Sequence, residues 1–159
     1  IAYHSNNPGV GMALEKDTER FKLFVSDIGL FITLSYKDKD FTENLIYDKM
    51  LSDKLDANLG YVYENAVAQI LVAKGNNLFY YTEKSETSNH LHEIDFLLSS
   101  GTKICPIEVK SGNYKTFKSF DDFCNKFSSR IGEKYIVHTK DYKRENGVTF
   151  IPVYMLPFL

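Results

Sequence analysis

Two short apolar segments carry charged residues where a buried strand has no need of them. Residues 93–98 and 104–110 show the alternation that is typical of strands, and residues 99–102 offer a turn between them. Side chains two residues apart in a strand point to the same side, so Glu108 and Lys110 are expected to share one face. Burying such groups in an apolar sheet costs desolvation energy that folding alone gives no reason to incur. The two segments therefore indicate a functional site.

A hairpin through residues 99–102 would bring a second carboxylate to this face. Ile94, Phe96 and Leu98 are expected to lie on one side of their strand and Asp95 on the other. If the two segments pair, Asp95 comes beside Glu108 and its lysine neighbour. We expect this pairing to define the centre of the sheet.

The strongest helix signal in the chain precedes these strands, over residues 58–74. Two apolar stripes lie side by side on it, which predicts a mostly buried helix, and Gly75 follows as a C-cap residue should. Glu64 is then a carboxylate among core residues. It is the candidate third acid of the site.

The rest of the chain predicts a mixed α/β or α+β fold around a central mixed sheet flanked by helices. After a helical N-terminal part, the expected order is helix-strand-strand-strand-helix-strand-strand, with Pro152 favouring an edge position for the last strand. The other expected helices cover residues 27–34, 42–51 and 114–127, and the other expected strands cover residues 21–25, 78–83, 134–138 and 148–154.

Three regions are expected along the chain. Residues 1–20 have turn chemistry and charge with little periodicity, so we expect a linker or the tail of a preceding domain. Residues 21–56 are expected to form a helical N-terminal extension, and residues 57–159 the core domain. The first residue is Ile1 rather than Met, and we expect a piece of a longer chain.

Composition and charge bound the function only loosely. The net charge is −2, with 9 basic and 15 acidic residues over positions 1–100 and 10 basic and 6 acidic residues over positions 101–159. A mildly basic second half is compatible with a phosphate-bearing partner, but an ordinary solvated surface is the preferred interpretation. We expect no signal peptide, no apolar run is long enough for a membrane span, and Cys105 and Cys124 lack metal-ligand spacing. We expect both cysteines to be reduced thiols in a cytoplasmic protein that does not contact a membrane. A disulfide between them remains the alternative.

Carboxylates on adjacent strands suit a hard divalent cation such as Mg²⁺, which prefers oxygen ligands. Asp95 and Glu108 would bind the ion, and Glu64 would complete the site directly or through water. Lys110 could orient an attacking water and stabilise phosphoryl charge. This chemistry suits hydrolysis of a phosphodiester.

The residues resemble a known superfamily at this point. Asp95 followed by Glu108-Val109-Lys110, after a helix that carries Glu64, looks like the PD-(D/E)XK nucleases. More narrowly, the chain is similar to a domain of unknown function found at the C-terminus of many bacterial and archaeal AAA+ ATPases. The segments that carry this resemblance are residues 21–30, 60–68, 93–97, 106–112 and 152–159.

The resemblance implies a restriction-endonuclease-like core, metal ligands at Asp95 and Glu108, a catalytic Lys110 and a helical acid at Glu64. Two departures stand out. Ile94 replaces the proline that usually precedes the first acid, and no phosphate-binding loop of an ATPase occurs in this chain. The expected partners are an N-terminal ATPase module of the same full-length chain and either DNA or RNA.

The sequence is compatible with three functions. The first is a Mg²⁺-dependent nuclease, the second is a non-catalytic interaction or regulatory domain of the ATPase with a degenerate site, and the third is an oligomerisation domain. For the acids and Lys110, the structural alternative is a set of ion pairs kept by the fold. Glu93 and the histidines His90 and His92 are expected to be solvated.

Overall fold

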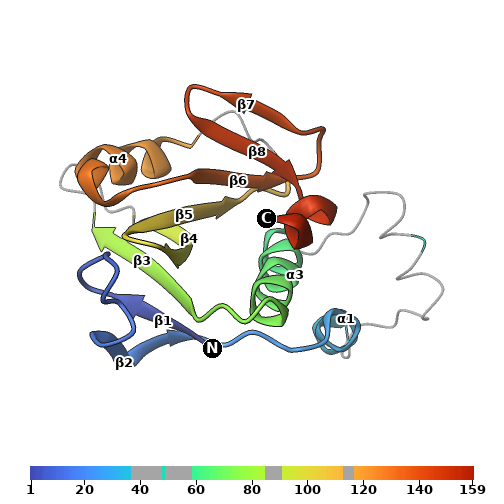
Figure 1. The fold of residues 1–159 in the computed structure, drawn as a ribbon. Coiled ribbons are helices and arrows are strands. Elements are labelled where there is room, and N and C mark those ends of the chain that lie inside the picture. The colour runs from blue at the N-terminus through green and yellow to red at the C-terminus, as the bar shows by residue number, and fades with distance from the viewer. Residues whose placement is uncertain (37–47, 49–58, 85–90, 113–116) are drawn as a thin grey trace.

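The structure is a computed structural model of the 159-residue chain. It describes residues 1–36, 48, 59–84, 91–112 and 117–159 (Figure 1). Apart from residue 48, the predicted helix over 42–51 lies outside the described residues, as do His90 and Lys115. Within the described part, no helix combines the length and the apolar character needed to cross a bilayer.

An eight-stranded mixed sheet forms the body of the molecule, in the order β2-β1-β3-β4-β5-β6-β8-β7 (Figure 1). The strands are β1 (Ala2–Ser5), β2 (Lys16–Lys22), β3 (Leu78–Lys84), β4 (Leu91–Ser100), β5 (Lys103–Val109), β6 (Lys134–His138), β7 (Lys143–Glu145) and β8 (Val148–Pro152). The helices are α1 (Ile28–Tyr36), α3 (Leu59–Ala73) and α4 (Lys118–Lys126), with 3₁₀ turns η1 (Ser128–Arg130) and η2 (Val153–Phe158). The mixed α+β class predicted from the sequence is confirmed.

Apolar residues on the two faces of the sheet form two cores. On one face α4 packs against β3, β4 and β6, with the fully buried Phe120 and Ile136 at the centre. On the other face α3 and η2 cover β3, β5 and β8, through Val67 and Leu156. A sheet covered on both faces has little water along its middle strands, so a charged group there needs a specific partner.

A β-bulge interrupts the pairing of β3 with β4. Phe79 pairs with Leu97 and Tyr81 pairs with Ile94, so that two residues of β4, Asp95 and Phe96, lie opposite the single residue between them on β3. As a result Ile94 packs in the core on the α4 side and Phe96 in the core on the α3 side. The prediction that these two side chains share a face is wrong, because the extra residue breaks the alternation between them.

The predicted hairpin between β4 and β5 is confirmed. Phe96 pairs with Ile107, and the antiparallel register runs from there to Ser100 and Lys103 at the turn. Gly101 takes a left-handed φ of 57°, which glycine adopts without steric cost. The same register extended by one residue places Asp95 opposite Glu108.

The N-terminal residues belong to the sheet, where the sequence indicated a linker over residues 1–20. β1 pairs in parallel with β3 and antiparallel with β2, so that these strands extend the sheet beyond the core predicted over 57–159. The buried His4 ring accepts a hydrogen bond from the Thr82 amide at 3.1 Å. The partners of β1 on β3 are more than 70 residues away along the chain, and so local periodicity does not reveal them.

The second departure is at the other edge. The residues between the last two predicted strands contain β7, which is joined to β8 by Asn146 and Gly147 with left-handed φ angles of 51° and 74°. Two such residues favour a tight hairpin turn. β8 therefore lies inside the sheet between β6 and β7, and the edge position suggested by Pro152 is wrong for the strand.

Asn65 joins α3 to the segment between β2 and α1. Its side-chain amide donates to the Val25 carbonyl and its Oδ1 accepts from the Val25 amide, both at 2.8 Å. The side chain is only 2% exposed, so neither group has water as an alternative partner. This pair of bonds fixes the backbone three residues after the end of β2.

We expect Asn65→Ala to lower the free energy of unfolding by roughly 2–3 kcal/mol, because two buried backbone groups lose their partners. Urea denaturation at pH 7 measures the change. Gln69→Ala, one turn further along α3 and exposed, serves as the control and should change it by less than about 0.5 kcal/mol. An equal loss in both variants would show that the Asn65 bonds do not stabilise the fold.

Candidate metal centre

Ionisable side chains gather where β4 and β5 face the first half of α3. We call this group the carboxylate centre. Its members are Glu64 of α3, Glu93 and Asp95 of β4, Glu108 of β5, Lys110 directly after β5, and Lys22 at the end of β2.

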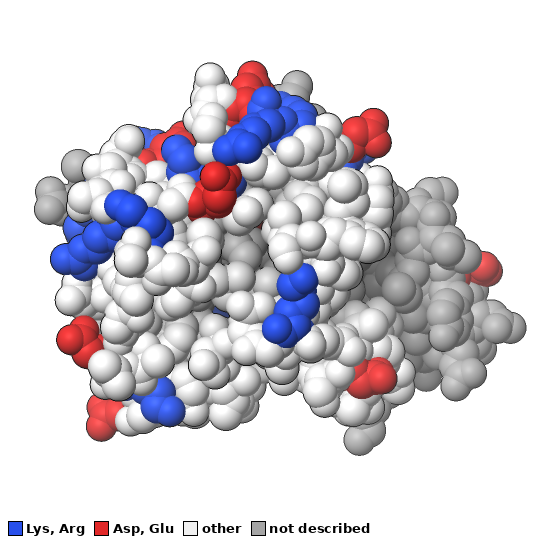
Figure 2. Space-filling view, viewed as in Figure 1, with Lys and Arg blue, Asp and Glu red and all other residues white. Residues whose placement is uncertain are grey.

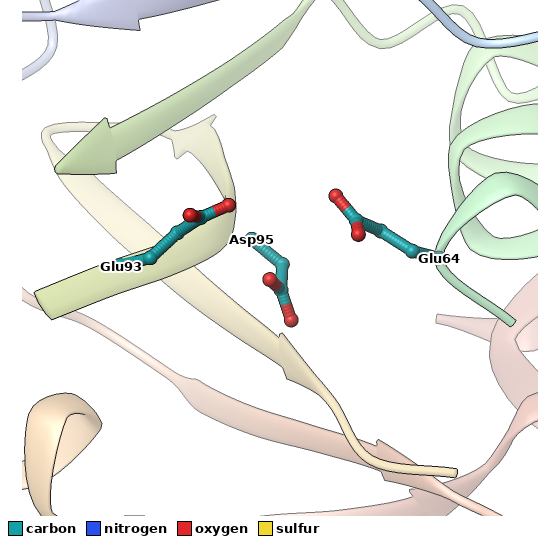
Figure 3. A group of neighbouring side chains, drawn as sticks. All are labelled: Glu64, Glu93 and Asp95. Atoms are coloured by element: carbon teal, nitrogen blue, oxygen red, sulfur yellow. The ribbon is translucent and has the colours of Figure 1, made fainter. Parts of the chain in front are cut away.

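Three of the carboxylates can share one ion. Oxygens of Glu64, Glu93 and Asp95 all lie within 4.8 Å of one another. Figure 3 shows Glu64 and Glu93 reaching toward each other from α3 and β4, with Asp95 between them. Ligands on opposite sides of a Mg²⁺ ion are about 4 Å apart, since each lies ~2.1 Å from the metal. The three side chains are thus within a small adjustment of a shared cation position.

Lys22 contacts two of these three carboxylates. Its Nζ donates to Glu64 Oε1 at 2.7 Å and also to Glu93 Oε1. The ammonium lies 5.2 Å from the centre of the Tyr80 ring, a cation–π distance. Burial by itself would lower the pKa of Lys22, but the carboxylates of Glu64 and Glu93 outweigh it and hold the pKa above its usual value. The lysine is therefore charged at neutral pH.

Glu108 has one partnered and one unpartnered oxygen. Lys110 Nζ donates to Glu108 Oε1 at 2.6 Å, whereas Oε2 is buried and has no hydrogen-bond partner among the described residues. Burial raises the pKa of Glu108, and the Lys110 ammonium only partly offsets this because Glu93 and Glu64 add repulsion. A buried carboxylate oxygen without a donor is costly, and a cation or a hydrogen-bond donor at this point would stabilise it.

Asp95 is held by the backbone of the neighbouring strand. The amide of Val109 donates to Asp95 Oδ2 at 2.7 Å. Burial raises the pKa of Asp95 well above its ordinary range, and the nearby carboxylates of Glu108 and Glu64 raise it further. The amide and the Lys22 ammonium act in the opposite direction without cancelling the effect.

Charges in the carboxylate centre do not balance. Four carboxylates face two ammonium groups, so the fully ionised centre carries two uncompensated negative charges. Burial is the main cause of the raised pKa values of Asp95 and Glu108, and repulsion from the neighbouring carboxylates adds to it. A divalent cation would neutralise the excess and restore ordinary ionisation.

The structure places the four predicted site residues in one region. Glu64 and Asp95 lie together, and Glu108 pairs with Lys110, although Glu108 is not in the set whose oxygens lie within 4.8 Å. Glu93 is the third member of that set, although the sequence indicated a solvated side chain for it. Its position two residues before Asp95 on the same strand was the sequence signal that could have predicted this.

Lys22 had no comparable sequence signal, because it comes from the far edge of the sheet. The remaining candidates are outside the centre. His92 Nδ1 lies 3.9 Å from Asp122 Oδ2, and Lys118 is exposed at the start of α4. Both cysteines are buried free thiols, as predicted.

The profile of one protein family matches residues 59–156, from the start of α3 into η2, and its description is "domain of unknown function (DUF4143)". The chain belongs to the DUF4143 family. No curated protein matches the sequence. Among solved structures, this DUF4143 chain is similar to the crystal structure of protein VC1899 from Vibrio cholerae, with 13% sequence identity and a TM-score of 0.39. The alignment covers 82% of this chain and 47% of that one, so the chain spans about half the length of that protein.

We expect Asp95→Asn to stabilise the metal-free protein at pH 7 by roughly 1 kcal/mol, a typical effect of one substitution, because the folded state no longer contains a buried carboxyl whose ionisation is unfavourable. The amide oxygen can still accept from Val109. A carboxyl whose folded pKa is raised binds more protons when folded, so stability falls as pH rises from the unfolded pKa of 3.8 through the raised value. The stability of the Asp95→Asn variant should therefore fall less with rising pH than that of the unmodified protein.

Chemical denaturation from pH 4 to 8 in the presence of a chelator measures both effects. Asp141→Asn, at an exposed aspartate between β6 and β7, is the matched control and should shift stability by less than about 0.5 kcal/mol at every pH. A destabilised Asp95→Asn protein at pH 7 would contradict the expected strain in the centre.

Proposed function

We propose that the carboxylate centre binds a hard divalent cation such as Mg²⁺ and that the domain hydrolyses phosphodiester bonds of nucleic acid. The observation that carries this proposal is the group of three convergent carboxylates, together with the buried Oε2 of Glu108, which has no hydrogen-bond partner in the described part of the chain and belongs to the residue opposite Asp95. Oxygen ligands of this kind suit Mg²⁺ or Mn²⁺. Once bound, the ion would polarise a phosphodiester and lower the pKa of a water molecule.

The side chains of this chain supply the other requirements of the reaction. Glu64, Glu93 and Asp95 would hold the ion, and Glu108 would orient Lys110 through their hydrogen bond of 2.6 Å. The Lys110 side chain is 26% exposed, and its ammonium could stabilise negative charge that develops on a phosphate.

Element order supports a restriction-endonuclease-like placement of this site. α3 precedes three antiparallel strands, and α4 then leads into β6, which pairs in parallel with β5. The acids lie on α3 and on the two central strands of this unit. The resemblance of the N- and C-terminal segments further supports a domain that follows an ATPase module in a longer cytoplasmic chain.

A non-catalytic interaction or regulatory domain is the second candidate, and the surface charge favours it. On the face seen in Figure 2, basic side chains form small groups beside acidic ones. Arg144 pairs with Glu133 at 2.9 Å, and Lys126 pairs with Glu83. Tight binding of a nucleic-acid backbone depends on basic groups that remain free for phosphates. A domain of this kind would bind the cation and leave nucleic acid uncut.

Isothermal titration of the unmodified protein with Mn²⁺ and Mg²⁺ tests the cation site. We expect one ion to bind, and Asp95→Asn to weaken binding by about 10-fold or more because a charged ligand is lost. Asp141→Asn should bind as the unmodified protein does. Absence of binding to the unmodified protein would overturn the proposal, and unchanged binding by Asp95→Asn would move the site elsewhere.

A cleavage assay then separates the two candidates. With labelled single- and double-stranded DNA and RNA in Mn²⁺, a nuclease should cut, and Lys110→Met should slow the reaction by roughly 10²–10³-fold. The variant should retain the ion, which titration verifies. Binding of the ion without cleavage of any of the four substrates would support the non-catalytic domain and reject the nuclease.

A further inference from the structure

Lys22 and the proposed cation need the same ligand atoms. The ammonium is within hydrogen-bonding distance of Glu64 and Glu93, which are two of the three carboxylates whose oxygens converge. An ammonium group and a divalent ion that share two carboxylates lie only a few ångströms apart, and like charges at that distance repel strongly in a partly buried site. Both cannot occupy these ligands at once without a large electrostatic cost.

We infer that Lys22 is an internal competitor for the cation site, which contacts Glu64 and Glu93 in the cation-free protein and is displaced when a divalent ion binds. This inference rests on the cation site proposed above and adds its regulation. Lys22 lies outside the residues that match the family profile, which begin at residue 59.

The backbone on both sides of Lys22 is anchored, so only its side chain is free to leave. Lys22 pairs with Ala2 of β1, and three residues later Val25 is held by the two bonds from Asn65. Asn65 is the next residue after Glu64 on α3. The lysine therefore starts from a fixed position at the rim of the centre, and its flexible four-carbon stem can rotate outward.

The exposure of the side chain permits this movement. The Lys22 side chain is 25% exposed, more than Glu64 at 14% and less than Glu93 at 36%, so it already reaches solvent at the rim of the centre. In the outward position the ammonium regains water, and the two glutamates become available to the ion. The N-terminal β1–β2 pair thus controls the occupancy of a site built by the rest of the sheet.

Mn²⁺ titration of Lys22→Met tests the competition. Met keeps most of the apolar stem and removes the charge, so we expect Mn²⁺ to bind about 10-fold more tightly or better than to the unmodified protein. Lys16→Met, at the other end of β2, is the matched control and should bind Mn²⁺ with unchanged affinity.

Acetylation of the unmodified protein provides a second readout that needs no variant. With an amine-reactive acetylating reagent and mass spectrometry, Lys22 should be labelled several-fold faster when Mn²⁺ is present, because its side chain becomes exposed. Labelling of Lys16 should not change. This measurement decides the matter if Lys22→Met fails to fold.

The outcomes separate this inference from the cation site itself. Equal or weaker Mn²⁺ binding by Lys22→Met, or labelling of Lys22 that stays constant or slows with Mn²⁺, overturns the competition and leaves the site intact. No Mn²⁺ binding by either the unmodified protein or Lys22→Met overturns the cation site. Tighter binding by the variant together with faster labelling of Lys22 supports both.

Discussion

Partial burial of four carboxylates at one place is the constraint on which the rest of the structure depends. Covered on both faces by helices, the sheet leaves little water around β4 and β5, and ionised groups there need cationic partners. The fold provides two ammonium groups, of which Lys110 pairs with Glu108 and Lys22 pairs with Glu64 and Glu93. Burial, and to a smaller extent repulsion between the carboxylates, raises the pKa values of Asp95 and Glu108. A site of this kind is suited to accept a further cation.

The bulge in β4 allows one strand to carry both apolar core residues and the acids of the carboxylate centre. A regular strand would place Ile94, Phe96 and Leu98 on one face, whereas the extra residue sends Ile94 to the α4 side and Phe96 to the α3 side. Asp95 lies at the point of this change and is fixed by the Val109 amide of the neighbouring strand. Bulges commonly re-aim a side chain next to a functional site.

The N-terminal strands give the centre its second lysine. β1 and β2 extend the sheet beside β3, and the Asn65 bonds to Val25 hold the following segment against α3. Because Glu64 and Asn65 are adjacent, the same turn of α3 fixes the backbone near Lys22 and supplies the carboxylate that Lys22 contacts. The position of the Lys22 charge in the carboxylate centre therefore depends on the attachment of the N-terminal strands to α3.

Local patterns in the sequence were enough for α3, the β4–β5 hairpin and, apart from β7, the order of helices and strands after residue 58, because apolar periodicity and turn residues act over short distances. They also brought Glu64, Asp95, Glu108 and Lys110 into one hypothesis. Only the tertiary structure decided that residues 2–5 and 16–22 join the sheet, that a bulge divides Ile94 from Phe96, and that Glu93 and Lys22 complete the centre. These features depend on pairing between strands distant in sequence, and a pattern confined to one segment carries no information about that partner.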